Sequence, residues 1–417
     1  MSQTEFQKYI HSKKFKDLLA KYEEGISSGS MPYIDTDDLI DIAEYYHINN
    51  RMADSEKAVE YCLELSPNDE YALFFKARLM LTVYHNPTEA QRIIESIDDY
   101  KSLIESIYIL AEVKMQQGKA DEAEDMLQKE YRNIIKEIEE KADGVDTSYN
   151  DDEEDEEDDD NDEISAEETL SRFPLDVATL YCDYGFLEYA DSWLCKVKDC
   201  GGELSFEYYE TLGRLRLYQN KYAEAIDAFN NALDVDAYNV AIWMQLSEAQ
   251  SCCEKYADAL QSIEYALAIE PNAEDAMFMK GNALYDLARY DDAMTLFRHM
   301  EERQPANPQI NLFLAALSFE TECRAEGMKE FQKALEKSNY DIIIITQVGI
   351  SLYELGYTDA AYDLLSTVFY NYLSKENDKE CPQQMIDCII KCCEKLNKEN
   401  EANFYKQYLE KRISNDK

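Results

Sequence analysis

Hydrophobic and small residues in the C-terminal half of the chain repeat with a period of 34 residues. Two series of small residues follow this spacing, one at Gly213, Ser247, Gly281, Ala315 and Gly349 and the other at Ala225, Ala259, Ala293, Gly327 and Ala361. Large apolar residues stand between them at Phe229, Ile263, Phe297, Phe331 and Leu365. A small residue lets a neighbouring helix backbone approach, and a large side chain fills the adjoining hole. The pattern therefore predicts antiparallel helix pairs stacked one on the next.

Weaker copies of this pattern extend in both directions along the chain. They are marked by Ala43, Ala77, Ala111, Ala178 with Ala190, and Ile389 with Ala402. The copy around Ala77 carries an extra residue near His85 to Pro87, which predicts a longer turn between its two helices. With these copies the chain holds about ten units.

One unit carries a specific family resemblance. The segment from Val240 to Ala273 has Trp243, Leu246, Ser247, Tyr256, Ala259, Ile263, Ala266 and Pro271, and it resembles the signature of the tetratricopeptide repeat. The resemblance implies an all-α fold, a right-handed superhelical solenoid of stacked antiparallel helix pairs. It also implies a protein that works by binding other proteins rather than by catalysis.

The repeats and their interruptions predict five parts. These are an N-terminal helical cap (1–35), a block of three units (36–137), an acidic insertion (138–170), a block of six units (171–375) and a degenerate capping unit (376–417). The insertion contains ten consecutive acidic residues, 151–160, and such a run favours a disordered spacer. Contact with a basic partner is the alternative, and a calcium loop is disfavoured because the run lacks the required glycine.

The charge balance narrows the choice of partner. The chain has 87 acidic and 41 basic residues and a formal net charge of −46, which repels nucleic-acid phosphate and anionic lipid. We therefore expect a protein or peptide partner of basic or amphipathic character, no nucleic acid and no membrane, although an acidic surface can also serve solubility alone. No apolar run has the length of a signal peptide or a membrane span, which favours a cytoplasmic location.

The sequence offers little catalytic chemistry. Its four histidines lie in separate units, and the motifs of hydrolases, phosphate loops and zinc peptidases are missing, so we expect no enzyme activity, no catalytic residue and no cofactor. The eleven cysteines suit free thiols in a reducing compartment. The group Cys381, Cys388, Cys392 and Cys393 and the pair Cys252 and Cys253 are interpreted as small core residues rather than as metal ligands.

The family resemblance also implies a binding surface. In tetratricopeptide proteins, positions two, five, nine and twelve of each unit line the concave face. In the C-terminal block these positions give the candidate groove residues Glu210, Arg214, Met244, Glu248, Phe278, Asn282, Tyr285, Leu312, Phe319 and Tyr353. The groove turns from charged to aromatic along its length, which suits an amphipathic segment. Alternatively, these side chains pack against the next turn of the solenoid or against its own C-terminal helix.

Some family members grip a partner's C-terminal carboxylate with lysines, an arginine and asparagines on this surface. Here the corresponding positions supply only the isolated basic residues Arg78 and Arg214, which argues against that specificity. The leading hypothesis is a non-catalytic scaffold or adaptor. The alternatives are an acidic holding chaperone for a basic client, and a regulatory subunit or noncanonical enzyme with a site between the two helical blocks. The last requires a pocket with convergent, perturbed titratable groups.

Overall fold

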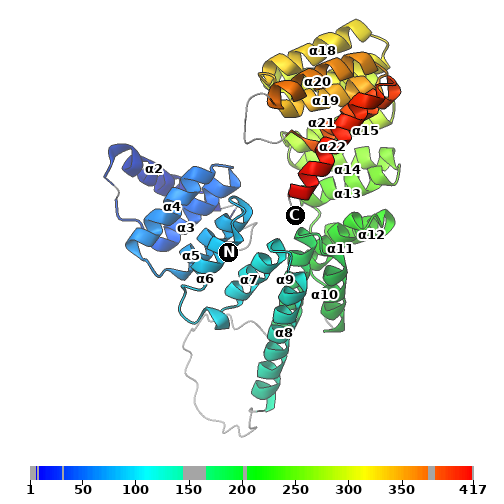
Figure 1. Ribbon diagram of the computed structural model, residues 1–417. Helices are drawn as coiled ribbons and strands as arrows, with labels where there is room; N and C mark the ends of the chain where they lie inside the picture. The colour runs from blue at the N-terminus through cyan, green and yellow to red at the C-terminus, as the bar shows by residue number, and fades with distance from the viewer. Residues whose placement is uncertain are drawn as a thin grey trace. The chain divides into compact units, whose positions relative to one another are not determined.

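The computed structural model describes residue 6 and residues 9–30, 32–143, 166–200, 204–373 and 381–415. Regular structure within these ranges is helical, with no strand among them (Figure 1). The prediction of an all-α fold is confirmed. The helices are α2 (Lys13–Ser28), α3 (Thr36–Ile48), α4 (Met52–Leu65), α5 (Glu70–Thr82), α6 (Pro87–Ile94), the 3-10 helix η1 (Tyr100–Ser102), α7 (Ile104–Gln116), α8 (Ala120–Asp143), α9 (Ala166–Asp183), α10 (Leu187–Asp199), α11 (Phe206–Tyr218), α12 (Tyr222–Val235), α13 (Val240–Cys252), α14 (Tyr256–Ile269), α15 (Glu274–Asp286), α16 (Tyr290–Arg303), α17 (Pro308–Glu320), α18 (Arg324–Lys337), α19 (Ile342–Glu354), α20 (Thr358–Leu373), α21 (Gln383–Lys395) and α22 (Glu399–Asn415).

The chain forms two compact units, unit 1 from Met1 to Asn220 and unit 2 from Lys221 to Lys417. Unit 1 contains α2, the pairs α3/α4, α5/α6, α7/α8 and α9/α10, and then α11. Unit 2 contains α12 and the pairs α13/α14, α15/α16, α17/α18, α19/α20 and α21/α22. Within each unit a helix packs against its pair partner and against the following pair, as α5 does against α6 and α7. Stacked helix pairs are thus the building principle of both units.

Short turns with one left-handed residue set the pair geometry. Three residues separate the helices of most pairs, and the middle one has a positive φ, as at Asn50 (57°), Gly118 (73°) and Ala288 (56°). Four residues, 83–86, separate α5 from α6, which confirms the predicted longer turn. A tight reversal of this kind favours glycine or asparagine because a Cβ crowds the backbone at positive φ.

The small residues of the repeat sit where two helices approach closely. A Cβ at Gly281 on α15 would lie 2.2 Å from Cζ of Phe297 on α16, and one at Gly349 would lie 2.4 Å from Leu365. The Phe297 ring is 1% exposed and stacks on Phe313 with ring centroids 4.8 Å apart. The predicted alternation of small and large residues therefore reflects direct contact across each pair.

Unit 2 also contains a buried ionic network. The Glu330 side chain is fully buried and lies 2.9 Å from both the Arg298 guanidinium and the Lys333 ammonium. The Asn311 amide donates to Glu330 Oε2 at 2.6 Å and to Glu301 Oε1 at 2.9 Å. This network ties α16, α17 and α18 together through groups whose charges compensate one another.

The acidic run of the predicted insertion lies outside the described residues. Helix α8 continues to Asp143 and α9 begins at Ala166, so both helices extend into the range 138–170. The five-part division of the chain stays a prediction. Among the helices of the described residues, none combines the length and apolar character needed to cross a membrane.

The cysteines are all free thiols. Cys381, Cys388, Cys392 and Cys393 are buried, as predicted for core residues, but Cys252 is exposed and its assignment to the core is wrong. Cys252 is the last residue of α13, where the helix ends at a turn open to solvent. Across the part of the chain that the structure describes, no group of histidine, cysteine and carboxylate side chains is arranged to hold a metal ion.

Candidate functional site

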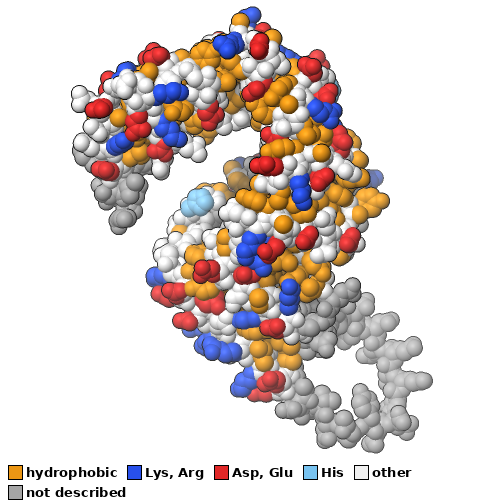
Figure 2. Space-filling view, turned by 90° about the vertical axis from the view of Figure 1, so that its right-hand side faces the viewer, with side chains coloured by type: hydrophobic (Ala, Val, Ile, Leu, Met, Phe, Trp, Pro, Cys, Tyr) orange, Lys and Arg blue, Asp and Glu red, His pale blue; other side chains and the backbone are white. Residues whose placement is uncertain are grey.

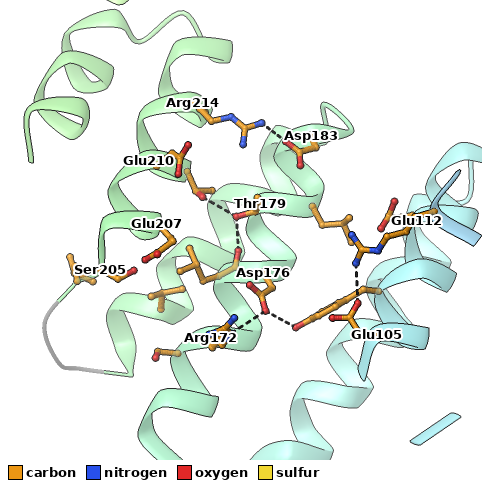
Figure 3. A pocket seen from close by; sticks show the side chains of 18 residues that line it. Glu105, Glu112, Arg172, Asp176, Thr179, Asp183, Ser205, Glu207, Glu210 and Arg214 are labelled. Carbon is orange, nitrogen blue, oxygen red and sulfur yellow. Dashed lines mark hydrogen bonds and ion pairs between the residues drawn. The ribbon is translucent and has the colours of Figure 1, made fainter. Parts of the chain in front are cut away.

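A pocket of about 700 Å³ opens in unit 1 between the first helices of successive pairs. Four helices, α5, α7, α9 and α11, contribute most of its lining, with smaller contributions from α10 and from residues 204 and 205. In Figure 3 the carboxylates of α7 lie on one side, the side chains of α11 lie on the other, and α9 runs between them. We call this pocket the unit-1 groove.

The lining residues recur at fixed positions of the repeat. When the small residues Ala77, Ala111, Ala178 and Gly213 are aligned as position eight, position nine supplies Arg78, Glu112, Thr179 and Arg214. Position five supplies Tyr108, Leu175 and Glu210, and position two supplies Glu105, Arg172 and Glu207. Positions two, five and nine of α7, α9 and α11, together with position nine of α5, therefore form a regular lattice around the groove.

Acidic groups outnumber basic ones in the groove. Its lining has six carboxylates, at Glu105, Glu112, Asp176, Asp183, Glu207 and Glu210, against three guanidinium groups, at Arg78, Arg172 and Arg214. On the face drawn in Figure 2, acidic and basic side chains are interspersed with apolar patches rather than gathered into a field of one sign. The groove thus shares the acidic excess of the whole chain, in which 87 acidic residues stand against 41 basic ones.

The three arginines already face carboxylates. Arg78 lies 3.0 Å from Glu105, and Arg214 forms an ion pair with Asp183. Arg172 Nε lies 4.0 Å from Asp176 Oδ2. The groove therefore offers an incoming anion no uncommitted cation among its lining residues.

Glu112 is the most buried carboxylate of the groove. Its side chain belongs to a residue that is 7% exposed, and its Oε2 accepts a hydrogen bond from the Tyr184 hydroxyl at 3.1 Å. Tyr184 is itself fixed by the Gln116 amide, which donates to its hydroxyl oxygen at 3.1 Å. Among the described residues, none donates a hydrogen bond to Glu112 Oε1. Burial raises the pKa of Glu112, and the nearby Arg78 charge and the Tyr184 bond only partly oppose this rise.

Burial also raises the pKa values of two further carboxyl groups in the groove. Burial raises the pKa of Asp176, although Arg172 and a hydrogen bond from the Tyr108 hydroxyl at 3.2 Å oppose the rise. Burial likewise raises the pKa of Glu210 against the opposing charge of Arg214. In all three cases desolvation outweighs the favourable partners, so the negative charges of the groove are incompletely compensated.

Hydroxyl groups between α9 and α11 are engaged with each other. Thr179 and Thr211 are joined by a hydrogen bond of 2.8 Å between their hydroxyl oxygens. Thr179 donates to the carbonyl oxygen of Leu175 at 3.0 Å, so Thr211 is the donor in the pair. The lining contains no histidine, lysine or cysteine that could activate either hydroxyl. The arrangement suits recognition better than nucleophilic chemistry.

The sequence-predicted groove residues divide between the two units. Glu210 and Arg214 line the unit-1 groove. The other eight, Met244, Glu248, Phe278, Asn282, Tyr285, Leu312, Phe319 and Tyr353, belong to unit 2. Of these, Glu248 and Asn282 are exposed, and the remainder are half-buried.

Several of the unit 2 candidates contact the protein core. The Phe278 ring packs against Phe297 and Phe313, with centroids 5.9 and 5.6 Å apart. Phe319 packs against Phe331 at 5.7 Å, and Met244 and Leu312 adjoin apolar clusters. These contacts favour the alternative in which the aromatic positions pack within the solenoid.

The two remaining aromatic candidates have polar contacts. The Tyr285 hydroxyl donates to Glu320 at 2.7 Å. Tyr353 lies beneath the Lys395 ammonium and lines a smaller pocket of about 210 Å³ together with Cys388 and Lys391. The structure thus places the ten predicted residues in separate surroundings, and only Glu210 and Arg214 share the large pocket of unit 1.

Most of the unit-1 groove was missed by the sequence interpretation. Glu105, Tyr108 and Glu112 stand at positions two, five and nine of the third N-terminal repeat, and Arg172 and Leu175 stand at positions two and five of the weaker repeat around Ala178. The same positional rule, applied to those repeats, would have found them.

Comparisons with known proteins agree with this architecture. Two family models described as tetratricopeptide repeat match residues 210–250 and 254–317. A TPR repeat-containing protein of Methanocaldococcus jannaschii, MJ1428, is 24% identical over 188 residues, covering 44% of this chain and 33% of that protein. Hsp70-Hsp90 organizing protein 2 of Arabidopsis thaliana is 22% identical over 232 residues, covering 52% of this chain and 38% of that protein. The chain therefore spans about a third of these relatives' own lengths.

Similar solved structures are smaller helical proteins. YrrB, described as a TPR protein with an unusual peptide-binding site, is 20% identical, with a TM-score of 0.36 over 42% of this chain and 90% of its own. MamA from Desulfovibrio magneticus RS-1 is 17% identical, with a TM-score of 0.34 over 41% of this chain and 97% of its own. The two matching repeat models show that the chain contains tetratricopeptide repeats within residues 210–317, and the 34-residue spacing and the helix pairs of both units support the same architecture beyond them.

Proposed function

We propose that the chain is a protein-interaction scaffold that binds a segment of a partner protein in the unit-1 groove. The observation that carries the proposal is the convergence of positions two, five and nine from successive first helices on one pocket of about 700 Å³. A pocket of this size falls within the usual range for ligand sites. Its helical walls place the lining side chains on rigid elements, which lowers the ordering cost of binding.

The comparisons support a scaffold in general terms. Tetratricopeptide repeats form extended surfaces from stacked units, and one relative is named as an organizing protein for Hsp70 and Hsp90. That relative is matched over 38% of its length, so its partners are not transferred to this chain. The proposed partner is a protein or peptide, and the side chains that line the groove indicate which kind of segment it binds.

A charge-swap variant tests the proposal without changing the net charge. Arg172 and Glu207 are exposed residues on α9 and α11 at the groove, and Arg172→Glu/Glu207→Lys reverses the pattern there. Lys136→Glu/Glu137→Lys makes the matched swap on the exposed surface of α8. We expect a partner captured from native cell extract by wild type and by the α8 swap to be lost with the groove swap. Equal capture by all three proteins would contradict the proposal.

A second candidate function is a regulatory or catalytic site in the same pocket. It is favoured by one observation, the convergence of Glu112, Asp176 and Glu210, whose pKa values are all raised by burial. The lining supplies no histidine, lysine or cysteine to act with them. Wild type and Glu112→Gln can be compared on chromogenic esters, phosphates and glycosides. Turnover that the substitution abolishes would favour catalysis over binding.

A further inference from the structure

We infer that the unit-1 groove selects a positively charged side chain, a lysine or arginine of the bound segment, and that Glu112 is the buried carboxylate that receives it. This inference rests on the proposed function, because it specifies the chemistry of the segment that occupies the same groove.

Glu112 keeps one carboxylate oxygen, Oε1, open to the pocket. Its residue is 7% exposed, and Tyr184 satisfies Oε2 with a single hydrogen bond of 3.1 Å. Among the described residues Oε1 receives no hydrogen bond, although ionised carboxylates accept several when buried in proteins. Oε1 is not one of the described side-chain atoms that are fully buried without a hydrogen bond, so a cation or a further donor in the pocket can reach it. The open oxygen on the wall of a large pocket marks the place for that donor.

Five further carboxylates line the same groove. Helix α7 adds Glu105, α9 adds Asp176 and Asp183, and α11 adds Glu207 and Glu210. Arg78 on α5 is the arginine whose charge acts on Glu112, and it already lies 3.0 Å from Glu105. The negative charge around Glu112 is therefore not cancelled from within the groove. An ammonium or guanidinium entering this space would be attracted by several carboxylates at once.

The same charges disfavour an acidic ligand. In some tetratricopeptide proteins, lysines, an arginine and asparagines on this surface bind a partner's C-terminal carboxylate. Here position nine is Glu112 on α7 and Thr179 on α9, and Arg78 and Arg214 at the two ends are held in ion pairs. An acidic segment would meet repulsion in the middle of the groove and find no free cation at its ends. The unit-1 groove therefore favours a positively charged ligand, whereas the carboxylate clamp favours a negatively charged one.

Phage display defines the chemistry of the segment independently of the identity of the partner. Random nonapeptides are selected on the full-length wild-type chain and counter-selected on Arg172→Glu/Glu207→Lys. We expect groove-dependent peptides to be enriched in lysine or arginine at one shared position. Groove-dependent peptides without a shared basic position would overturn the inference while leaving the proposed function intact. Absence of any groove-dependent peptide would count against the proposed function itself.

A second experiment assigns the cation to Glu112. A selected peptide is labelled with fluorescein and titrated by anisotropy, beside versions in which the shared residue is citrulline or norleucine. We expect Glu112→Gln to weaken binding of the basic peptide about tenfold or more, as for loss of a charge-assisted hydrogen bond, and Glu137→Gln on α8 to leave it unchanged. Binding of the neutral peptide should be the same for wild type and Glu112→Gln. Equal losses for basic and neutral peptides would refute the assignment.

Folding has to be controlled in the same samples. Glutamine keeps the size of Glu112 and an oxygen that can accept from Tyr184, and it removes a buried charge, so Glu112→Gln should melt no lower than wild type by circular dichroism. If that variant nevertheless fails to fold, Glu112→Met, a neutral side chain of similar length, provides the same comparison. A properly folded variant that binds the basic peptide as tightly as wild type would overturn the inference.

Discussion

Replacement of Gly281 by alanine should destabilise unit 2. Gly281 lies in the middle of α15, where alanine would ordinarily stabilise a helix by about 1 kcal/mol relative to glycine. The added Cβ, however, would lie 2.2 Å from Phe297 Cζ, against an optimum of about 3.5–4.0 Å for two carbon atoms. The helix-propensity gain and the steric cost therefore act in opposite directions.

The surroundings of Phe297 decide which effect is larger. The ring is 1% exposed and is stacked on Phe313 at 4.8 Å with an interplanar angle of 4°, so it cannot turn away freely. Overpacking of a well-packed core costs about 1–3 kcal/mol, and an overlap of this depth belongs at the upper end. After the propensity gain is subtracted, we expect a net loss of about 2 kcal/mol. For a unit of this size the melting temperature would fall by about 4–8 °C.

Urea unfolding of the full chain, followed by circular dichroism, measures this loss in the transition of unit 2. Asn282→Ala is the control, because Asn282 is the exposed neighbour on the same helix, and surface changes of this kind stay within about 0.5 kcal/mol. Adding Phe297→Leu to Gly281→Ala should relieve the clash and make the double variant more stable than the sum of the two single losses predicts. An unchanged or raised stability of Gly281→Ala would refute the close-packing argument.

Three further predictions concern stability and one concerns binding. Glu330→Gln should lower the free energy of unfolding by about 2 kcal/mol, because it removes the buried carboxylate that pairs with Arg298 and Lys333, and urea unfolding measures this. Burial alone would raise the pKa of Glu301, but hydrogen bonds from Asn311, Lys337 and Arg298 hold it at about 2, below its usual 4.5. Its contribution is therefore present above pH 4.5 and lost as the pH falls from 4.5 towards 2, so the stability of Glu301→Gln should vary less over this range. Ala288→Gly should stabilise unit 2 by about 1 kcal/mol, because Ala288 is exposed and has a φ of 56°, and a lower melting temperature would contradict this. Partner binding in the groove should weaken as salt is raised from about 0.05 to 0.5 M, because the exposed part of its charge is screened, whereas binding that is insensitive to salt would argue for apolar contacts.

The helical architecture could be predicted because the same contacts between helices recur in each repeat. Gly281 and Gly349 are small for the same reason, the approach of a large side chain on the second helix, and a 34-residue period exposes such positions directly. The longer turn before α6 was also visible, as a one-residue slip near His85. By contrast, Cys252 has the character of a core residue, and its exposure depends on where α13 ends.

The candidate site was less accessible to sequence interpretation. The alternation of small and large residues indicates how the helices pack against one another. The groove, by contrast, is lined by side chains at other positions of the repeat. Glu112 looks like any charged helical residue until the fold buries it beside Tyr184. The division between the units falls at Asn220 and Lys221, in a three-residue turn like those of other pairs, and no local sequence signal distinguishes it.

Site-specific photo-crosslinking tests the central claim most directly. A photoreactive phenylalanine analogue is placed at Glu207 in the unit-1 groove, at Glu248 among the predicted unit 2 positions, or at Glu137 on α8, all three of which are exposed. After irradiation with the partner, the crosslinked peptides are sequenced by mass spectrometry. The account predicts adducts from position 207, to a segment that carries a lysine or arginine, and none from position 137. Adducts from position 248 or 137 with none from position 207 would place the partner elsewhere and contradict the account.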